Sequence, residues 1–373
     1  MDQGKKAAEA RNPGILNRIA SLKIDFNQIK FERKIGYGSF SEVFQASLGN
    51  SLIAVKKIPS DEITSTKIEN LLKEIDLVST CDHPNIIKVI GWCESPSILI
   101  CLEYATLGSL QRFLSDSNII KLGWSHSKTK IAMEAAAGLA YLHNRGIVHR
   151  DIKSENLLVF GQNNSFTIKV ADFGSCRNIN DYSKTISGSI LWFAPELARG
   201  VSEYNFKTDI WAFGICLCEI ISHSLPYEDL FSQDSFFNLV GVSQGKINPL
   251  EQITSASEIF KHQQETLGYQ KVLQLIELCC QYQPENRPDF KNIIFFLMQI
   301  MIEDTNDRTG WQHQEDSILV QRRDMIRRAS SLTLDRHRFS EESSFNSPTS
   351  SKIKRISDPT SSKKRSKKFQ YVE

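Results

Sequence analysis

Three side chains close together in the chain could act jointly on a phosphate. The segment His149–Asn156, HRDIKSEN, contains the carboxylate of Asp151, the ammonium of Lys153 and the amide of Asn156. A carboxylate can accept a hydroxyl proton, an ammonium can neutralise a phosphate, and an amide oxygen can bind a hard metal ion. Three such residues in so short a segment could occur by accident, so the interpretation depends on whether other parts of the chain supply further phosphate-binding and metal-binding residues.

Two earlier features are suitable partners for a polyphosphate. Gly36 and Gly38 lie in a turn between strand-like runs, and Lys56 follows at the end of the next run. Glycines let backbone N–H groups approach phosphates closely because no Cβ intervenes. A lone G-x-G is more often a simple hairpin, but an ammonium at this spacing favours a phosphate site.

A later segment supplies a second carboxylate. The strand-like runs LLVF and FTIKVADF flank GQNNS, whose Gly and Asn residues favour a chain reversal. This hairpin would bring Asp172 back beside Asn156. Two oxygen ligands from distant positions could then share one Mg²⁺ ion.

These motifs resemble those of protein kinases. HRDIKSEN matches the catalytic loop pattern H-R-D-x-K-x-x-N, and the glycine turn, Ala54-Val55-Lys56, Asp172-Phe173-Gly174 and Ala194-Pro195-Glu196 follow in family order. Ser41 departs from the pattern, because the family has a third glycine there. LEYATLGSL, GLAYLH and WFAPE are similar to the tyrosine-kinase-like group, so the chain resembles a eukaryotic-type serine/threonine kinase of that group.

The resemblance implies an α+β, two-lobed protein kinase fold, with a small β-rich N-lobe containing one key helix and a larger, mainly α-helical C-lobe. We expect a flexible segment at 1–25, a kinase domain at 28–302 and a basic, Ser-rich, disordered tail at 304–373. The domain would divide into an N-lobe at 28–102, a hinge at 103–105 and a C-lobe at 106–302.

Apolar periodicity supports these expectations. Gly49-Asn50 predicts a hairpin turn, and the apolar residues of 64–80 recur at helical spacing with Glu74 among them. Residues 126–147 predict a helix with a C-terminal glycine, Gly146. DIWAFGICLCEII is apolar all round, which predicts a buried helix. No element is predicted for 243–268.

The resemblance also implies roles for particular residues. Asp151 and Lys153 would be catalytic, and Asn156 and Asp172 would hold Mg²⁺, with Mn²⁺ as an alternative metal. Glu74 would pair with Lys56, Asp209 would brace the catalytic loop, and Glu196 would pair with Arg287. ATP would be bound by Ile35, Gly36, Tyr37, Gly38, Ser39, Phe40, Ser41, Val43, Ala54, Lys56, Glu74, Glu103, Ala105 and Leu158.

The function implied is transfer of the γ-phosphate of ATP to serine or threonine hydroxyls of protein substrates in intracellular signalling. Lys153, two residues after Asp151, is similar to the Ser/Thr-specific form of the loop, although dual specificity stays open. The competing class is a pseudokinase scaffold that binds nucleotide or partners without transfer. Its usual mark, loss of the strand lysine or of either aspartate, is absent from this sequence.

Serines and a threonine in two segments are candidate regulatory sites. The segment from Asp172 to Glu196 resembles the kinase activation segment. A phosphate on Ser183, Thr185, Ser187 or Ser189 could pair with Arg150 and hold this segment, or these could be solvated hydroxyls. Basic residues precede Ser330, Ser340 and Ser357 in the tail, and autophosphorylation there is one alternative. KIKR and KKRSKK could act in nuclear import or acidic-lipid binding, or the tail could simply be solubilising.

Charge and cysteine patterns bound the remaining classes. Residues 321–373 contain 14 Lys and Arg against 6 Asp and Glu, whereas the rest has 31 against 37, so a basic tail follows a mildly acidic globule. The 8 cysteines lie mostly in apolar runs without C-x-x-C pairs, which favours buried thiols and a cytoplasmic protein. We expect no signal peptide, myristoylation, transmembrane segment or specific nucleic-acid binding, and nuclear entry could occur through the tail.

Overall fold

The computed structural model divides into two units, Met1–Ala329 and Ser330–Glu373, and all described residues lie in the first. The structure describes residues 13–38, 41–57, 64–94, 98–116, 127–162, 165–179, 188–200, 204–227, 241–245, 249–250 and 267–306.

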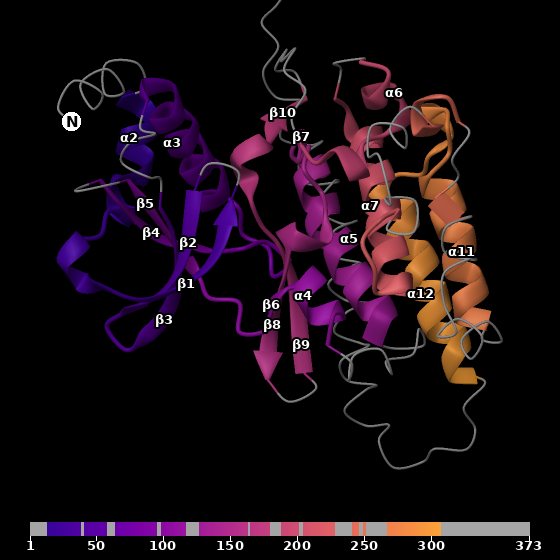
Figure 1. The fold of residues 1–373 in the computed structure, drawn as a ribbon, viewed down its shortest axis with the longest axis horizontal. Coiled ribbons are helices and arrows are strands. Elements are labelled where there is room, and N and C mark those ends of the chain that lie inside the picture. Colours follow the sequence, from indigo (N-terminus) through magenta and orange to yellow (C-terminus); the bar gives the residue numbers. More distant parts are fainter. Residues whose placement is uncertain are drawn as a thin grey trace, which may run out of the picture. The chain divides into compact units, whose positions relative to one another are not determined.

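The N-terminal part is an antiparallel sheet with strand order β1-β2-β3-β5-β4 (Figure 1). Its strands are β1 (Ile29–Gly38), β2 (Ser41–Leu48), β3 (Ser51–Lys57), β4 (Val89–Cys93) and β5 (Leu99–Glu103). Gly49, at φ +60°, lies in the β2–β3 turn, which confirms the predicted hairpin. Ile53 and Val55 of β3 are buried in a cluster on one face, so Ala54 and Lys56 point to the opposite face.

The predicted helix at 64–80 is confirmed as α3 (Ser65–Ser79). The Thr64 hydroxyl caps it by accepting a hydrogen bond from Lys67 N at 3.2 Å. Its buried side chains recur at helical spacing and are Ile68, Leu71, Leu72, Ile75 and Val78. Glu74 lies on the same helix and is held beside these apolar residues.

The chain before β1 differs from the predicted flexible segment. Residues 13–25 include helix α2 (Pro13–Ile19) and 3₁₀ helix η1 (Ala20–Leu22), and a further 3₁₀ helix, η2 (Phe26–Gln28), leads into β1. Ile19 is fully buried with residues of α3 and Trp92, and such burial contributes about 1.5–3 kcal/mol. The prediction was wrong here because only a few apolar residues make this contact, too few to stand out as a pattern.

The C-terminal part is mainly helical (Figure 1). Two short sheets contribute β6 (Gly108–Ser109), β8 (Leu157–Gln162) and β9 (Ser165–Val170) to one and β7 (Ile147–Val148) and β10 (Arg177–Asn178) to the other. The α-helices are α4 (Leu110–Leu114), α5 (Thr129–Asn144), α6 (Pro195–Ala198), α7 (Phe206–Ser222), α11 (Leu267–Cys279) and α12 (Phe290–Asn306). The 3₁₀ helices are η6 (Ser154–Asn156), η7 (Phe173–Ser175), η8 (Ile190–Trp192) and η10 (Pro284–Asn286).

Helix α7 is the centre of the C-terminal core. It is buried on all sides from Thr208 to Ile221, as its apolar sequence predicted, and packs with α5, α11 and α12. Gly146, at φ +74°, follows α5 and confirms the predicted glycine terminus. All eight cysteines are free thiols, and all except Cys280 are buried. The region 243–268 lies mostly outside the described residues.

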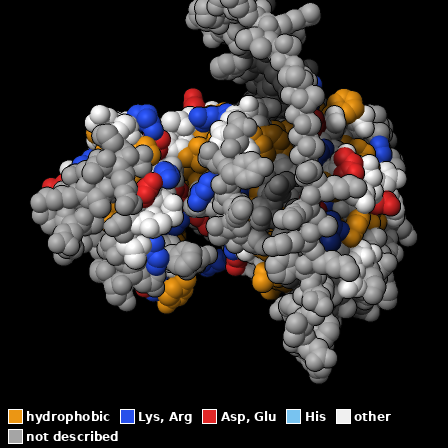
Figure 2. Space-filling model, turned by 90° about the horizontal axis from the view of Figure 1, so that it is seen from above, with side chains coloured by type: hydrophobic (Ala, Val, Ile, Leu, Met, Phe, Trp, Pro, Cys, Tyr) orange, Lys and Arg blue, Asp and Glu red, His pale blue; other side chains and the backbone are white. Residues whose placement is uncertain are grey.

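The described surface is mixed in charge. Figure 2 shows Lys and Arg side chains interspersed with Asp and Glu side chains on the face that it presents. Among the described residues, no helix has the length and apolar character that spanning a bilayer requires. The basic tail from residue 321 lies outside the described residues.

Candidate active site

A cavity of about 830 Å³ lies at the sheet face that carries Ala54 and Lys56. The catalytic loop, the hinge at 103–105 at the end of β5, and Asp172-Phe173 also line it. The predicted residues that line this cavity are Ile35, Gly36, Tyr37, Ser41, Val43, Ala54, Lys56, Glu74, Glu103, Ala105, Lys153, Asn156, Leu158 and Asp172. Of the other predicted nucleotide residues, Gly38 ends β1, and Ser39 and Phe40 lie outside the described residues.

The cavity also has lining residues that the sequence reasoning missed. Ile100 lies opposite Lys56 in the β3–β5 ladder and shares its face. Leu102, which the resemblance places at the gate of the deeper pocket and which was therefore not missed, lies opposite Ala54 and also lines the cavity. Strand periodicity from Leu102 could have identified Ile100. Other missed lining residues are Arg33, Ile87, Val89, Thr106, Leu107, Gln111, Arg112, Glu155 and Ala171. These come from separate loops and strands, so no local pattern connects them.

The predicted pair of Lys56 and Glu74 forms, and Asp172 joins it. Lys56 Nζ lies 2.8 Å from Glu74 Oε1 and 2.9 Å from Asp172 Oδ1. Burial disfavours the ammonium, but the two carboxylates outweigh it and raise the pKa of Lys56 above its ordinary value. Burial also favours protonation of Asp172, yet Lys56 reverses that effect and lowers the pKa of Asp172. The cluster therefore holds a cation beside an ionised carboxylate.

The catalytic-loop residues converge through the 3₁₀ turn η6. The Asn156 amide nitrogen donates to the Asp151 carbonyl oxygen at 2.8 Å and to Asp151 Oδ2 at 3.0 Å. Lys153 Nζ lies 3.7 Å from Asp151 Oδ2 and 2.9 Å from Glu155 Oε2. Burial opposes the charge of Lys153, but Asp151 and Glu155 raise its pKa. Asp151 is thus oriented by its own loop.

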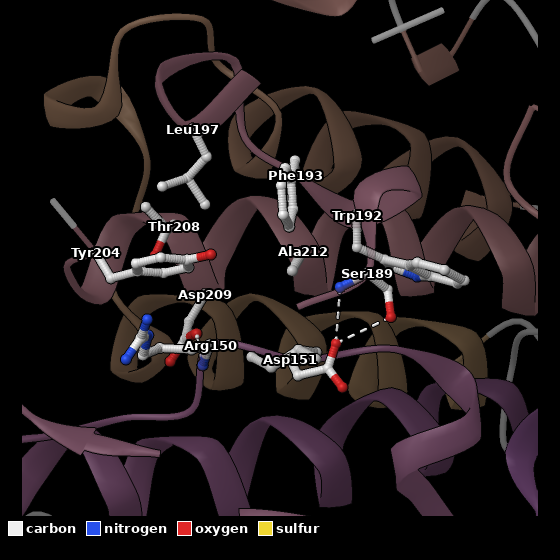
Figure 3. Close-up of a pocket in the computed structure, with 11 residues that line it drawn as sticks. Arg150, Asp151, Ser189, Trp192, Phe193, Leu197, Tyr204, Thr208, Asp209 and Ala212 are labelled. Atoms are coloured by element: carbon white, nitrogen blue, oxygen red, sulfur yellow. Dashed lines mark hydrogen bonds between the residues drawn. The ribbon is translucent and has the colours of Figure 1, made fainter. Parts of the chain in front are cut away.

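Ser189 contacts both catalytic-loop side chains. Its backbone N–H and its hydroxyl donate to Asp151 Oδ1 at 2.9 and 3.0 Å (Figure 3). The same hydroxyl accepts a hydrogen bond from Lys153 Nζ at 3.0 Å. Ser189 therefore joins the segment before Pro195 to the catalytic loop.

Asp209 braces the catalytic loop, as the resemblance implied. Its carboxylate accepts hydrogen bonds from His149 N at 2.8 Å and Arg150 N at 3.0 Å. Arg150 has φ +73°, a conformation that costs energy for a residue with a side chain. Because both amides point to one buried carboxylate of α7, packing of α7 maintains the strained backbone next to Asp151.

The predicted pair of Glu196 and Arg287 is also present. Arg287 Nη1 and Nη2 lie 2.7 and 2.8 Å from the two carboxylate oxygens of Glu196, and the arginine is buried. Such two-pronged pairing fixes orientation as well as distance. It anchors the end of the segment that carries Ser189.

Arg150 points away from Ser189 in this arrangement. Its guanidinium lies 4.2 Å from the centre of the Tyr204 ring, and Figure 3 shows the two side chains stacked. Burial lowers the pKa of Arg150; Tyr204 opposes this shift, and the nearby Arg177 adds to it. The predicted phosphate partners Ser183, Thr185 and Ser187 lie outside the described residues.

The hinge strand is tied to the C-terminal part by Glu103. Lys169 Nζ lies 2.6 and 2.7 Å from the two carboxylate oxygens of Glu103, and Lys88 N donates to Glu103 Oε1 at 2.8 Å. These contacts occupy the Glu103 side chain. The Glu103 backbone N–H also donates to the Lys88 carbonyl oxygen at 3.1 Å, so this residue is held on both its side chain and its amide.

The buried carboxylate of Glu219 joins the segment that contains Ser189 to the catalytic loop. Glu219 of α7 accepts hydrogen bonds from the Ser154 hydroxyl and, at 2.9 Å, from Trp192 Nε1. Burial raises the pKa of Glu219 to about 7, although these hydrogen bonds oppose the shift. The carboxyl thus holds its proton to higher pH in the folded chain than in the unfolded chain.

Glu219 is therefore expected to make folding stability fall as pH rises from about 4.5 to about 7. In this window the unfolded carboxyl has lost its proton and the folded one retains it, so the unfolded state binds fewer protons. The maximum slope is about 1.4 kcal/mol per pH unit. Urea unfolding between pH 5 and 7 gives the slope of the unfolding free energy against pH. This slope should be less negative in Glu219→Gln than in the parent, whereas exposed Glu285→Gln should match the parent. Equal slopes for all three would contradict the assignment.

Comparisons with known proteins agree with this geometry. The family model described as "Protein kinase domain" matches residues 29–295. The chain therefore belongs to the protein kinase family, and its β-sheet N-terminal region and helical C-terminal region are those of that domain.

Several relatives are named as kinases. The chain is 34% identical over 307 residues to "Probable serine/threonine-protein kinase drkB" of Dictyostelium discoideum, covering 81% of this chain and 41% of the relative. It is 30% identical over 289 residues to "Serine/threonine-protein kinase STY17" of Arabidopsis thaliana, covering 76% and 47%. It is 35% identical over 293 residues to "Dual specificity testis-specific protein kinase 2" of Rattus norvegicus, covering 76% and 46%. The chain thus spans less than half the length of each of these relatives.

Proposed function

We propose that this chain transfers the γ-phosphate of ATP to serine or threonine hydroxyls of proteins. The observation that carries the proposal is the joint placement of two networks in the part of the chain that the structure describes. Lys56, Glu74 and Asp172 form one, and Asp151, Lys153 and Asn156 form the other. Lys56, Asp172, Lys153 and Asn156 line the same cavity.

Phosphoryl transfer asks the protein mainly to position reactants and to neutralise phosphate charge. Asp151 would orient the acceptor hydroxyl and take its proton, and Lys153 would stabilise the transferring phosphate. Lys56 would bind the phosphates that stay behind, with the turn at Gly36 to Ser41 covering them. Val43, Ala54 and Leu158 would enclose the adenine.

Mg²⁺ fits the residues present, with Mn²⁺ as a second candidate. Asp172 and Asn156 supply hard oxygen donors at one cavity, and the Asp172 side chain is 38% exposed, so a metal can reach it. Among the described residues, no group of three His, Cys, Asp or Glu side chains forms a metal cage. Mg²⁺ commonly binds through one or two protein ligands plus substrate phosphates, whose charge it neutralises.

Serine or threonine specificity rests on Lys153 and its contact with Ser189, and the names of the relatives support it. One relative is named as dual-specific, so tyrosine is the competing acceptor. Incubating the full chain with labelled ATP, Mg²⁺ and a generic protein substrate, followed by phosphoamino acid analysis, tests this. We expect phosphoserine and phosphothreonine, and phosphotyrosine alone would contradict the proposal.

The competing function is a scaffold that binds nucleotide without transfer. Each network argues against it, because Lys56, Asp151 and Asp172 are all present and hydrogen-bonded to the expected neighbours. Nucleotide-induced stabilisation without phosphate incorporation on any peptide of a library would favour the scaffold.

Ser189 is proposed as a positioning residue rather than as a phosphosite. A phosphate on its hydroxyl would place negative charge against the Asp151 carboxylate that it now contacts. Ser189→Ala should lower kcat/KM by about 2- to 10-fold, since one hydroxyl that bridges Asp151 and Lys153 is lost. Ser189→Thr, which keeps the hydroxyl, should retain activity. Equal losses in both variants on a peptide substrate would contradict this role.

Regulation would use residues outside the described ranges. We propose that phosphate on Ser183, Thr185 or Ser187 displaces the Tyr204 ring from Arg150, and that Ser330, Ser340 and Ser357 in the basic tail are modified by basophilic kinases or by the chain itself. If mass spectrometry found Ser183, Thr185 and Ser187 unmodified in the active enzyme, the proposed displacement of Tyr204 from Arg150 would be contradicted.

The proposed location is cytoplasmic, with nuclear entry through the tail. Deletion of residues 321–373, followed by imaging and kinetics, tests this.

A further inference from the structure

The N-terminal residues 13–24 contact the helix that carries Glu74. They lie before residue 29, where the match to the kinase family model begins. Figure 1 shows α2 alongside α3, on the side of α3 away from the C-terminal part. The segment continues as η1 and runs to the edge strand β4.

The apolar contact is continuous with the core beneath α3. Ile19 is fully buried, and Ile15, Leu16 and Leu22 pack against the same cluster. On the α3 side the cluster contains Ile68, Leu71, Leu72 and Ile75. Leu71, Leu72 and Ile75 bracket Glu74 in the sequence. The α3 residues on either side of Glu74 are thus the ones that pack against the N-terminal segment.

A polar contact fixes the position along α3. Arg18 Nε and Nη2 donate to the two carboxylate oxygens of Asp76 at 2.7 and 2.6 Å. Asp76 lies two residues after Glu74 on α3. A two-pronged arginine–carboxylate pair defines both distance and angle, so α2 and α3 are held in one relative orientation.

The edge strand fits this segment closely. Trp92 Nε1 donates to the Ile19 carbonyl oxygen at 2.9 Å, and Ile24 N donates to the Trp92 carbonyl oxygen at 2.8 Å. A Cβ at Gly91 would lie 2.6 Å from the Leu22 carbonyl oxygen and 2.2 Å from Ile24 Cδ1. Only glycine therefore fits at position 91 while residues 13–24 lie in this place. Arg18 and Gly91 are independent signs that the contact is built into the fold.

We propose that residues 13–24 are a positioning element for phosphoryl transfer, which rests on the proposed function above. They hold α3 against the sheet so that Glu74 keeps its 2.8 Å contact with Lys56. Arg18 acts through Asp76 on α3 and does not touch the reacting groups. Loss of the Arg18 contact lets α3 move outward, Glu74 leaves Lys56, and the lysine is less well placed for the phosphates.

A charge-reversal cycle in the full chain tests the contact. Arg18→Asp and Asp76→Arg should each lower kcat/KM on a peptide substrate by about fivefold, and the double variant should recover to within about twofold of the parent. Lys73→Gln is the matched control, because it removes an exposed ion pair with Glu69 on the same helix. It should leave kcat/KM unchanged. No loss in Arg18→Asp, or an equal loss in Lys73→Gln, would overturn the proposal.

A second cycle separates positioning from general stability. In a Glu74→Ala background the contact with Lys56 is removed, so adding Arg18→Asp should lower kcat/KM by less than about twofold. An additive loss in that background would show that Arg18 acts on something other than Glu74 and would also overturn the proposal.

Hydrogen exchange supplies a readout that does not need transfer. Amides of residues 65–79 should exchange faster in Arg18→Asp than in the parent or in Lys73→Gln, and unchanged exchange would overturn the proposed contact. A parent chain that transfers no phosphate would refute the proposed function instead, and the exchange result would still report whether residues 13–24 hold α3.

Discussion

Replacing Asp151 by asparagine is expected to lower kcat by about 100- to 10,000-fold, the usual contribution of a positioned general base. Asp151 Oδ1 accepts two hydrogen bonds from Ser189, and Oδ2 accepts one from Asn156. The carboxylate is therefore held on both oxygens beside the place where an acceptor hydroxyl must enter. An amide has the same size but cannot take the proton.

Phosphate incorporation by the purified full chain, with labelled ATP, Mg²⁺ and a peptide substrate, measures this effect. The asparagine Oδ1 can still accept both Ser189 bonds, but the bond from Asn156 Nδ2 to Oδ2 is lost, so we expect a modest fall in melting temperature with the fold intact. Asp82→Asn, at an exposed position, is the matched control and should keep parental kcat. Undiminished transfer by Asp151→Asn in an intact fold would refute the proposed mechanism.

Lys56→Met is expected to lower kcat/KM by about 100- to 1000-fold, as removal of one preorganised charge at a reacting centre does. The variant also leaves Glu74 and Asp172 close together without the cation that both now contact. Breaking a buried pair in this way costs stability, commonly about 3–5 kcal/mol. Glu74 would relieve part of that cost by taking up a proton.

The sign of the pH dependence follows from that proton. Burial already raises the pKa of Glu74, and removal of Lys56 raises it further. An acid whose pKa is higher in the folded state makes the fold more stable as pH falls. The loss of unfolding free energy in Lys56→Met should therefore be smaller at pH 5 than at pH 7, as measured by urea unfolding. Lys57→Met is the matched control, because the next residue of β3 points to the other face. Parental kcat/KM in Lys56→Met would contradict the assignment of the phosphate-binding lysine.

Residues whose role follows from local pattern were predictable. The hairpin at Gly49, helix α3 and the buried helix α7 each have a period or a turn residue that a short window reveals. The pairs of Lys56 with Glu74 and of Glu196 with Arg287 were implied by family motifs, and both are present.

Ser189 shows the limit of such reasoning. In the sequence it is one of several hydroxyls in a polar segment, and it was grouped with Ser183, Thr185 and Ser187 as a candidate phosphosite. Its hydrogen bonds to Asp151 and Lys153 cross more than thirty positions of the chain. They join segments far apart in the chain, a tertiary effect that no short window contains.

The sequence by itself thus determined the chemistry, because HRDIKSEN, Lys56 and Asp172 already contain the side chains that phosphoryl transfer needs. Tertiary structure alone decided how they are held. Asp209 stabilises the strained backbone at Arg150 from a distant helix, and Arg18 reaches Asp76 across 58 positions. Such contacts depend on which faces pack together, and that choice is made by the burial of whole elements rather than by any local pattern.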